Sequence, residues 1–278
     1  MSDSSTGPDE RRVLRITGDD AKAFLQGIVT NDVDKLKDGL VYAALLSPQG
    51  KYLFDFFLFL RDGEIHLDAS EAQADALMQR LSMYKLRARV EFETVDLKVE
   101  RGIDETRRPR GAFSDPRHEE LGWRFYSGAG EQDGLPGSND SPPSRRFAPA
   151  TGPQTADIDW TAIRVANCIP ETGIELVSNS TYILEAGFER LNGVDFAKGC
   201  YVGQEVTARM RHKTRLRKGL AVVNVDGAVP VGTEIRASGR VAGTLFSQAR
   251  GKGIAYLRFD RMSGEMSADG VKVRPPEA

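Results

Sequence analysis

The sequence predicts an α+β protein that ends in a small antiparallel β-barrel or sandwich. In the amino-terminal part, predicted strands joined by hairpin turns are followed by an amphipathic helix, which is the pattern of an antiparallel sheet covered by a helix. From residue 218 onward, short strands alternate with glycine turns. A chain of 278 residues, 40% of them hydrophobic and 28% charged, can form two or three domains with their own cores.

The amino-terminal part begins with a predicted strand at residues 13–16 and a helix that Asp19 or Asp20 can cap. The apolar face of this helix consists of Ala21, Phe24, Leu25 and Ile28. Three strands, joined by the turns Ser47-Pro48-Gln49-Gly50 and Asp62-Gly63, are expected at residues 40–46, 51–60 and 64–69. A helix over residues 71–87 and a strand over 90–99 complete this α+β unit.

The middle of the chain is less regular. Residues 107–153 are enriched in Pro, Gly, Ser and Arg, and only 121–126 has a strand pattern. Within them, residues 133–146 are predicted to form a mobile surface loop. A helix over 159–167 follows, and Pro170 ends it. The carboxyl-terminal strands are predicted at residues 220–225, 233–237, 240–248, 253–259 and 271–273.

Composition argues against several classes of protein. The net charge of -2 argues against a dedicated nucleic-acid binder. Cys168 and Cys200 form no disulfide framework and no CxxC metal pair, and the three histidines lack ligand spacing. Residues 1–12 lack the pattern of a signal or transit peptide, and the longest apolar run, 53–60, is too short to cross a bilayer. We therefore expect a soluble, cytoplasmic protein without a membrane partner or a metal site of its own.

One stretch combines more chemical groups than a core element needs. Residues 198–205 read Lys-Gly-Cys-Tyr-Val-Gly-Gln-Glu, which brings a thiol, an amine, a phenol, an amide and a carboxylate together with two glycines. Lys198 would favour the thiolate of Cys200 if its ammonium lies close. A turn with a buried, inert cysteine is the alternative, since free cysteines are often buried.

A row of cations follows this stretch. Basic residues occupy every second position at Arg209, Arg211, Lys213, Arg215 and Arg217. An extended strand would place all five on one face. Such a face could bind an anion, either a polyglutamate tail or a nucleic-acid backbone, or it could simply be solvated.

The stretch 198–205 resembles the signature of the YgfZ family of folate-binding proteins, relatives of the glycine-cleavage aminomethyltransferase that act in iron–sulfur protein maturation. Three further segments are similar to the family's pattern: FLQGIVTNDV at residues 24–33, LEAG at 184–187, and Thr207-Ala208-Arg209. The stretch 104–155 matches least.

The resemblance implies a three-domain, aminomethyltransferase-like α+β fold around a central folate cavity. Its discontinuous first domain would combine residues 1–46 with 152–214 and bind folate. Residues 47–151 would form a ferredoxin-like second domain, and 215–278 the carboxyl-terminal β-barrel.

The resemblance also implies roles for individual residues. Glu185 matches the carboxylate that holds the pterin, and a carboxylate can accept two hydrogen bonds side by side. Trp160 matches a tryptophan associated with folate, although a core anchor on an amphipathic helix explains it as well. Lys198 and Cys200 would be the functional amine and thiol. Further candidate folate-binding residues are Asn31, Tyr201, Gln204, Glu205 and Arg209, although a plain polar turn also explains Thr30-Asn31-Asp32.

One position departs from the aminomethyltransferase pattern. The residue that aligns with the catalytic aspartate of those enzymes is Phe54, and a phenyl ring cannot take up a proton. Asp55 is the next residue, so a shift of one position would restore a catalytic carboxylate.

The resemblance therefore implies a tetrahydrofolate-binding factor for the assembly or repair of iron–sulfur proteins. Cys200 would lie at the rim of the folate cavity as a transient cluster ligand or a redox thiol. The partners would be a folate derivative and iron–sulfur client or assembly proteins, because one cysteine cannot hold a cluster alone. Two other functions stay open: folate-dependent aminomethyl or one-carbon transfer, and RNA binding through the row of cations.

Overall fold

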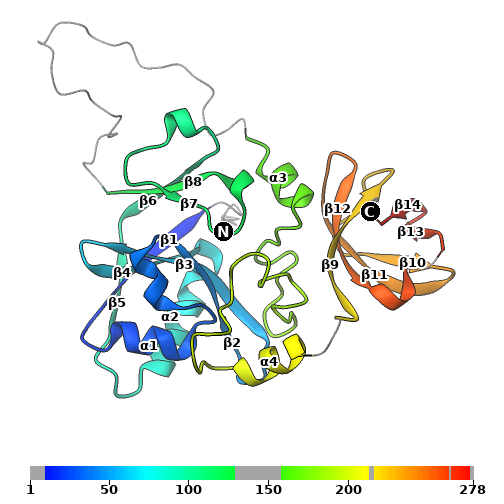
Figure 1. The fold of residues 1–278 in the computed structure, drawn as a ribbon. Helices are drawn as coiled ribbons and strands as arrows, with labels where there is room; N and C mark the ends of the chain where they lie inside the picture. Colours follow the sequence, from blue (N-terminus) through cyan, green and yellow to red (C-terminus); the bar gives the residue numbers. More distant parts are fainter. Residues whose placement is uncertain (1–9, 129–157, 213–215, 263, 276–278) are drawn as a thin grey trace, which may run out of the picture.

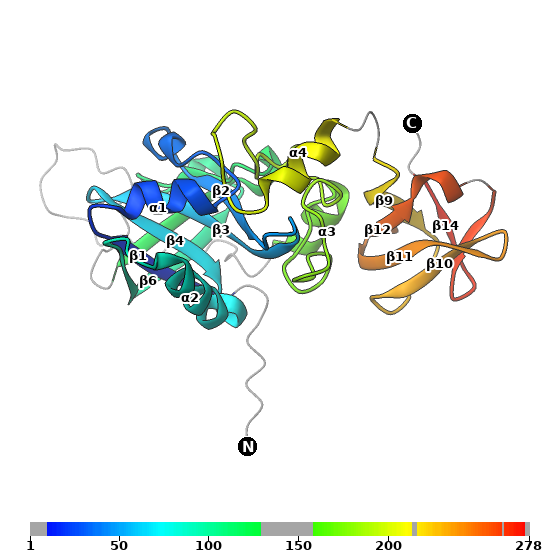
Figure 2. The same cartoon turned by 90° about the horizontal axis from the view of Figure 1, so that it is seen from below.

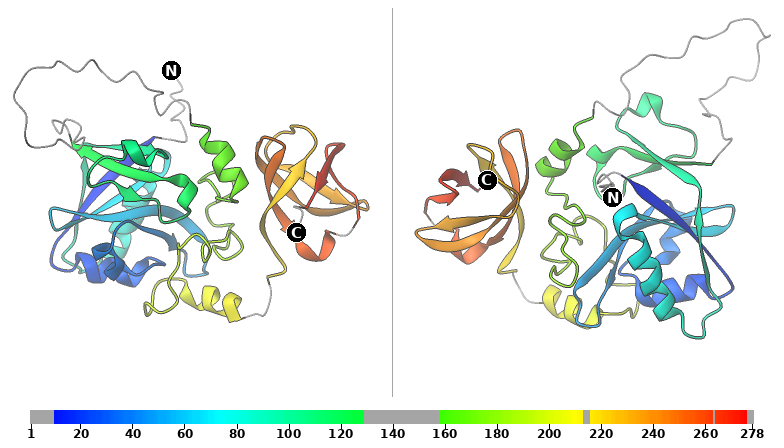
Figure 3. Two further views of the ribbon diagram at one scale, coloured as in Figure 1. Left: turned by 45° about the horizontal axis from the view of Figure 1, so that its top comes forward. Right: turned by 180° about the vertical axis from the view of Figure 1, so that it is seen from behind.

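The computed structural model describes residues 10–128, 158–212, 216–262 and 264–275. The mobile loop predicted at residues 133–146 lies outside these residues. A β-barrel lies at one end of the molecule, and helix α3 (Trp160–Ala166) lies between it and the two remaining sheets (Figure 1, Figure 3). Within the described part of the chain, no helix has the length and apolar character needed to cross a bilayer.

The first sheet has five antiparallel strands in the order β2-β3-β4-β1-β5. The strands are β1 (Arg11–Thr17), β2 (Val41–Leu46), β3 (Tyr52–Arg61), β4 (Glu64–Ser70) and β5 (Glu91–Val95). The domain boundary predicted between residues 46 and 47 falls in the β2–β3 hairpin. Because hydrogen bonds join β2 to β3 and β4 to β1, the residues on the two sides of that boundary share one sheet.

One face of this sheet carries the first core. Helices α1 (Ala21–Ile28) and α2 (Glu71–Lys85) and the 3-10 helix η1 (Val33–Lys37) cover it (Figure 2). Phe56 and Leu58 of β3 pack into this core, whereas Phe57 and Phe59 point to the opposite face. The alternation of strand side chains thus makes β3 apolar on both faces, and both faces must be covered.

The opposite face carries the second core. A three-stranded sheet in the order β6-β8-β7 lies over it, together with α3 and the irregular segment 167–203. The strands are β6 (Leu97–Gly102), β7 (Phe113–Ser114) and β8 (Trp123–Gly128), and the 3-10 helices η2 (Glu105–Arg107) and η3 (Glu119–Leu121) connect them. Strand β7 was not predicted, because its two residues are too few to give a periodic pattern.

The single strand predicted at residues 90–99 is wrong. The chain forms β5 and β6 there, in two different sheets, with Asp96 between them. Val95 and Leu97 both pack against the second core, so the alternation of side chains continues across the point where the pairing partner changes. Sequence periodicity does not reveal such a change.

A buried ionic network joins the two sheets. Asp68 of β4 accepts a hydrogen bond from Arg11 Nε at 2.6 Å and another from Tyr126 Oη at 2.9 Å. Arg124 of β8 lies 3.3 Å from Asp68 and donates to Asp115 at 3.0 Å. Since Asp68 and Arg124 are both buried, each charge depends on its partner.

The predicted carboxyl-terminal barrel is confirmed. Six antiparallel strands close in the order β10-β11-β12-β9-β14-β13 around their own core. The strands are β9 (Lys218–Val225), β10 (Thr233–Ala237), β11 (Arg240–Ala249), β12 (Lys252–Arg258), β13 (Met266–Ala268) and β14 (Val271–Arg274), with the 3-10 helix η5 (Phe259–Arg261) after β12. The short strand β13 was missed.

The prediction that the row of cations lies on an extended strand is wrong for its first two members, Arg209 and Arg211. Residues Gln204–His212 form helix α4, on which positions two apart point in nearly opposite directions. Arg209 pairs with Glu205 and Arg211 with Glu189, so neighbouring carboxylates neutralise both cations. Lys213 and Arg215 lie outside the described residues, and over residues 204–212 the extended row of cations does not form.

Removal of the Asp68 carboxylate should destabilise the protein strongly. In Asp68→Ala, the partly buried Arg11 and the buried Arg124 lose a counter-ion, and we expect a loss of about 3–5 kcal/mol of unfolding free energy in urea titrations. The matched control is Glu93→Ala. Glu93 is an exposed partner of Arg15, which lies on β1 as Arg11 does, so its removal should leave the urea midpoint unchanged. Equal midpoints for the two variants would contradict a stabilising network.

Candidate functional site

Residues 198–203 form a loop that leads into α4, and Gln204 and Glu205 begin that helix. Cys200 is exposed and carries a free thiol. Gly203, with a φ of +81°, packs so closely on the β2–β3 turn that a Cβ there would lie 2.5 Å from the Ser47 carbonyl oxygen. Only glycine tolerates that approach, so one end of the loop is fixed against the first sheet.

Lys198 fixes the other end of the loop. Its ammonium donates to the carbonyl oxygens of Gln26 at 2.7 Å and Val29 at 2.5 Å, at the carboxyl end of α1. The Gln26 side chain in turn donates to the Lys198 carbonyl at 3.4 Å and to Asp32 at 2.9 Å. A cation is favoured at this end of a helix, where carbonyl groups lack partners. Burial lowers the pKa of Lys198 to about 8, which Asp32 and Asp195 partly oppose.

These contacts change the interpretation of Lys198. It was expected to act on the neighbouring thiol, but its hydrogen bonds anchor the loop to α1. The two segments that carry the family pattern, 24–33 and 198–205, meet through this exchange between Gln26 and Lys198. Gln26 was not among the predicted site residues, since a glutamine on a helix gives no signal of its own.

Tyr201 and Gln204 shape the turn into α4. The Gln204 side chain accepts a hydrogen bond from the Tyr201 backbone N–H at 3.1 Å. The Tyr201 hydroxyl is buried, and burial raises its pKa to about 12, an effect that the nearby Thr207 hydroxyl reduces. No described residue meets hydrogen-bond geometry with that hydroxyl. Within the described part of the chain, Tyr201 thus has one buried polar atom without a hydrogen-bond partner.

Glu205 and Arg209 lie on the outer face of α4. Their side chains are 87% and 66% exposed and form an ion pair at 3.1 Å, one helical turn apart. Neither is buried in a cleft, so their predicted part in folate binding stays a prediction without geometric support.

Asn31 uses its side chain within the fold. Its amide donates to the carbonyl oxygens of Tyr42 at 2.8 Å and Asn192 at 2.6 Å, and its oxygen accepts from Asp32 N–H and from Lys35. Asn31 therefore joins strand β2 to the segment 167–203. All of these bonds are internal, which favours the interpretation of Thr30-Asn31-Asp32 as a structural turn.

Glu185 is a buried carboxylate that faces the barrel. It is 8% exposed, and its Oε2 accepts a hydrogen bond from Tyr256 Oη of β12 at 2.6 Å. Lys218 Nζ of β9 lies 3.8 Å from the same oxygen. Among the described residues, no hydrogen bond reaches Oε1. Tyr256 and Lys218 were missed, because they lie far from Glu185 in the sequence and carry no motif.

Trp160 begins α3 beside the same barrel. Asp159 caps this helix by accepting from the Ala162 N–H at 2.9 Å. The indole packs against the second core, and the Arg101 guanidinium lies 4.4 Å from the centre of its ring. Trp160 is only partly buried, so the core interpretation and the ligand-stacking interpretation both remain compatible with its position.

Asp55 and Phe54 point to opposite faces of β3. A β-bulge at Leu53 leaves both Leu53 and Phe54 in the first core, and Asp55 on the opposite face. The Asp55 carboxylate accepts hydrogen bonds from Tyr52 Oη at 2.7 Å, Thr172 Oγ1 at 2.5 Å and Tyr42 Oη at 3.0 Å. Burial raises the pKa of the neighbouring Glu171, and Asp55 adds to that rise. None of the three hydroxyl groups was predicted as a partner of Asp55.

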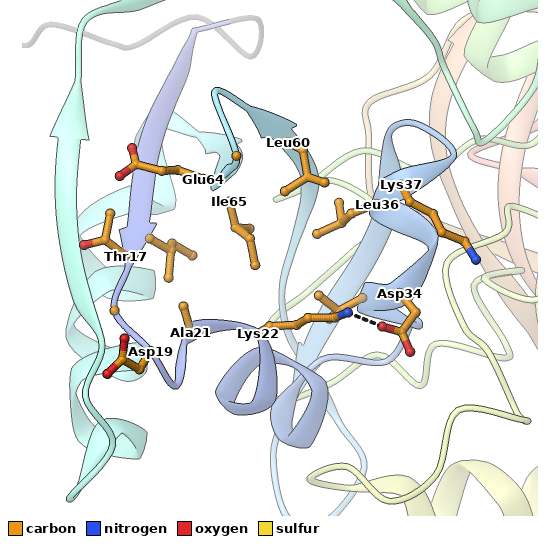
Figure 4. A pocket seen from close by; sticks show the side chains of 14 residues that line it. Thr17, Asp19, Ala21, Lys22, Asp34, Leu36, Lys37, Leu60, Glu64 and Ile65 are labelled. Atoms are coloured by element: carbon orange, nitrogen blue, oxygen red, sulfur yellow. Dashed lines mark ion pairs between the residues drawn. The ribbon is translucent and has the colours of Figure 1, made fainter.

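Two cavities open on the first sheet. One of about 580 Å³ lies between α1, η1 and the β3–β4 hairpin, with Leu36 and Ile65 among its apolar walls and the Lys22–Asp34 ion pair on one side (Figure 4). None of the predicted site residues lines it. The other, of about 650 Å³, is lined by Asn31, Tyr42 and Arg108 among others.

Comparison with known proteins places these features in context. Residues 217–278 match the family model of the CAF17 C-terminal β-barrel domain. The chain is 30% identical to the mitochondrial iron–sulfur cluster assembly factor IBA57 of Mus musculus, over 93% of this chain and 78% of that protein. It is 28% identical to the human protein of that name, with coverages of 95% and 81%.

A solved structure shares the fold. The glycine cleavage system aminomethyltransferase T of Bartonella henselae superimposes with a TM-score of 0.69 at 12% identity, over 96% of this chain and 83% of that one. Such a likeness shows the fold alone. The predicted aminomethyltransferase-like α+β fold with a carboxyl-terminal barrel is thus confirmed. The relatives are named mitochondrial, whereas a cytoplasmic location was predicted for this chain.

The two cysteines should react at very different rates. Cys200 is exposed, whereas burial raises the pKa of Cys168 to about 11, which leaves only about 0.1% of it as thiolate at pH 8. Iodoacetamide should therefore alkylate Cys200 quickly and Cys168 slowly, and the Cys168 rate should rise about tenfold per pH unit up to pH ~11. Mass spectrometry of timed samples, with Cys200→Ser and Cys168→Ser as controls, measures both rates. Equal labelling of the two thiols would contradict the partial burial of Cys168.

Proposed function

This chain belongs to the IBA57 family of iron–sulfur cluster assembly factors, and we propose that it is such a factor, which binds tetrahydrofolate at Glu185 and handles clusters through Cys200. The observation that carries the proposal is that one irregular segment, 167–203, bears both a buried, oriented carboxylate and an exposed thiol on a fixed loop. Leu184 and Tyr201, the neighbours of these two residues in the chain, pack into the same second core.

The chemistry of Glu185 supports a pterin ligand. The reduced pterin ring presents an amino group and a ring N–H side by side, and a carboxylate can accept from both. Tyr256 occupies one acceptor position on Oε2, so Oε1 and a second lone pair of Oε2 remain for the ligand. Partial exposure of Trp160 next to the barrel supports stacking of a flat ring there.

The position of Cys200 supports contact with a cluster held by another protein. An exposed thiol can reach a ligand position on an iron, but a cluster needs about four thiolates. The remaining ligands must then come from a client or assembly protein. Anchoring of the loop by Lys198 and Gly203 limits its freedom, which lowers the entropic cost of that contact.

A second function is favoured by one observation, the Asp55 carboxylate held by three hydroxyl groups on the face of β3 that bears the second core. A positioned carboxylate of this kind could assist folate-dependent one-carbon transfer. This candidate requires turnover of tetrahydrofolate with an aminomethyl donor, and loss of that turnover in Asp55→Asn. Absence of turnover in the wild type removes it.

Calorimetric titration with tetrahydrofolate under reducing conditions tests the folate site. Glu185→Gln keeps the shape of the side chain but loses the charge, and we expect it to weaken binding at least tenfold, because hydrogen bonds to a charged group contribute about 1.5–3 kcal/mol. Cys200→Ser is the matched control and should bind like the wild type. No binding by the wild type would remove the folate proposal.

A separate experiment tests the thiol. Cells that lack this protein should regain the activity of their iron–sulfur enzymes when the wild type is supplied, but not with Cys200→Ser, since a hydroxyl is a poor cluster ligand. Cys168→Ser is the control and should restore activity. Full restoration by Cys200→Ser would exclude the thiol from cluster handling.

A further inference from the structure

The barrel holds Glu185 through both its backbone and its side chain. The Glu185 carbonyl oxygen accepts a hydrogen bond from the Leu220 N–H of β9 at 2.7 Å. The side chain accepts from Tyr256 of β12, and Lys218 of β9 lies nearby. Tyr256 and Leu220 are directly opposite each other in the β12–β9 ladder. Glu185 therefore contacts two adjacent barrel strands, β9 and β12.

Gly219 allows β9 to approach the backbone of Glu185 closely. A Cβ at Gly219 would lie 2.9 Å from the Glu185 carbonyl oxygen and 3.6 Å from its Cα. A contact of 2.9 Å is shorter than a carbon and an oxygen normally adopt, so any side chain at 219 would push β9 away. The close contact between the barrel and residue 185 thus depends on the residue type at this position.

The Tyr256 hydroxyl is a constant hydrogen-bond donor. Burial, and then the hydrogen bond to Glu185, raise the pKa of Tyr256 well above its usual value, so the phenol stays protonated at any physiological pH. A protonated phenol that donates to Oε2 favours the ionised carboxylate and fixes its plane. Lys218 adds a positive charge on the same side.

We propose that Tyr256 is a positioning residue, which holds the Glu185 carboxylate ready for a ligand with two adjacent N–H donors, so that the barrel completes the binding site. The ligand class that fits is a 2-amino-4-oxo-pyrimidine ring, as in a reduced pterin, and the inference rests on the folate binding proposed above. Because the ligand and the barrel contact the same carboxylate, ligand binding also favours the docked position of the barrel.

The test compares tetrahydrofolate binding of Tyr256→Phe with that of Thr244→Val. The first removes the hydroxyl that donates to Glu185, and the second removes a hydroxyl from the opposite position on β11, with no bond to Glu185. We expect the dissociation constant to rise about tenfold in Tyr256→Phe and to stay unchanged in Thr244→Val, with thermal unfolding of both free proteins near that of the wild type.

A double-mutant comparison separates positioning from a general loss of structure. In the Glu185→Gln background, Tyr256→Phe should weaken binding far less than in the wild type, because the two residues act together.

The outcomes are distinguishable. Wild-type binding that is lost in Glu185→Gln but unchanged in Tyr256→Phe would overturn the role of Tyr256 and leave the folate site standing. Wild-type protein that does not bind tetrahydrofolate overturns both the folate site and this inference. Equal weakening by Tyr256→Phe and Thr244→Val would show only a perturbed barrel and would also overturn the inference.

Discussion

The fold depends on a sheet in which two neighbouring strands, β2 and β3, are apolar on both faces. All six residues of β2 are buried, and β3 sends aromatic side chains to each side. Helices α1 and α2 cover one face, and a second sheet, α3 and the irregular segment 167–203 cover the other. That segment carries Glu185 and Cys200, so the need to bury the second face determines where both groups lie.

Regular structure is scarce around the candidate site, and specific polar contacts replace it. The ammonium of Lys198 satisfies carbonyl groups at the end of α1, and Asn31 ties β2 to residue 192. The barrel adds the hydrogen bonds to Glu185. These contacts explain how a loop with two glycines can present a thiol in a defined position: its ends are fixed, and only its middle is free.

Local patterns predicted most of the fold. Alternation located β1 to β4 of the first sheet and, apart from β13, the strands of the barrel, and the apolar faces located α1, α2 and α3, because these signals depend on near neighbours. The failures involve distant partners. The bulge at Leu53, which places Phe54 in the first core and Asp55 on the opposite face, depends on the register with β2. The row of cations suggested a strand, yet residues 204–212 are helical, with Thr207 buried on the inner side of α4.

The candidate site was predicted in part, and only through motifs. Glu185 and Cys200 were named from the resemblance, whereas Gln26, Tyr256 and Lys218 were not, since their roles depend on contacts across many residues of sequence. Lys198 was named for a role in thiol activation, and its hydrogen bonds show an anchoring role instead. Sequence patterns identify reactive groups more readily than the groups that orient them.

The most direct test of this account is a crystal structure of the protein with tetrahydrofolate bound. We expect the pterin amino group and ring N–H to lie within hydrogen-bond distance of the Glu185 carboxylate, Tyr256 to keep its bond to Oε2, and Cys200 to stay exposed. A pterin found away from Glu185, for example in the cavity beside α1 and η1, would contradict it.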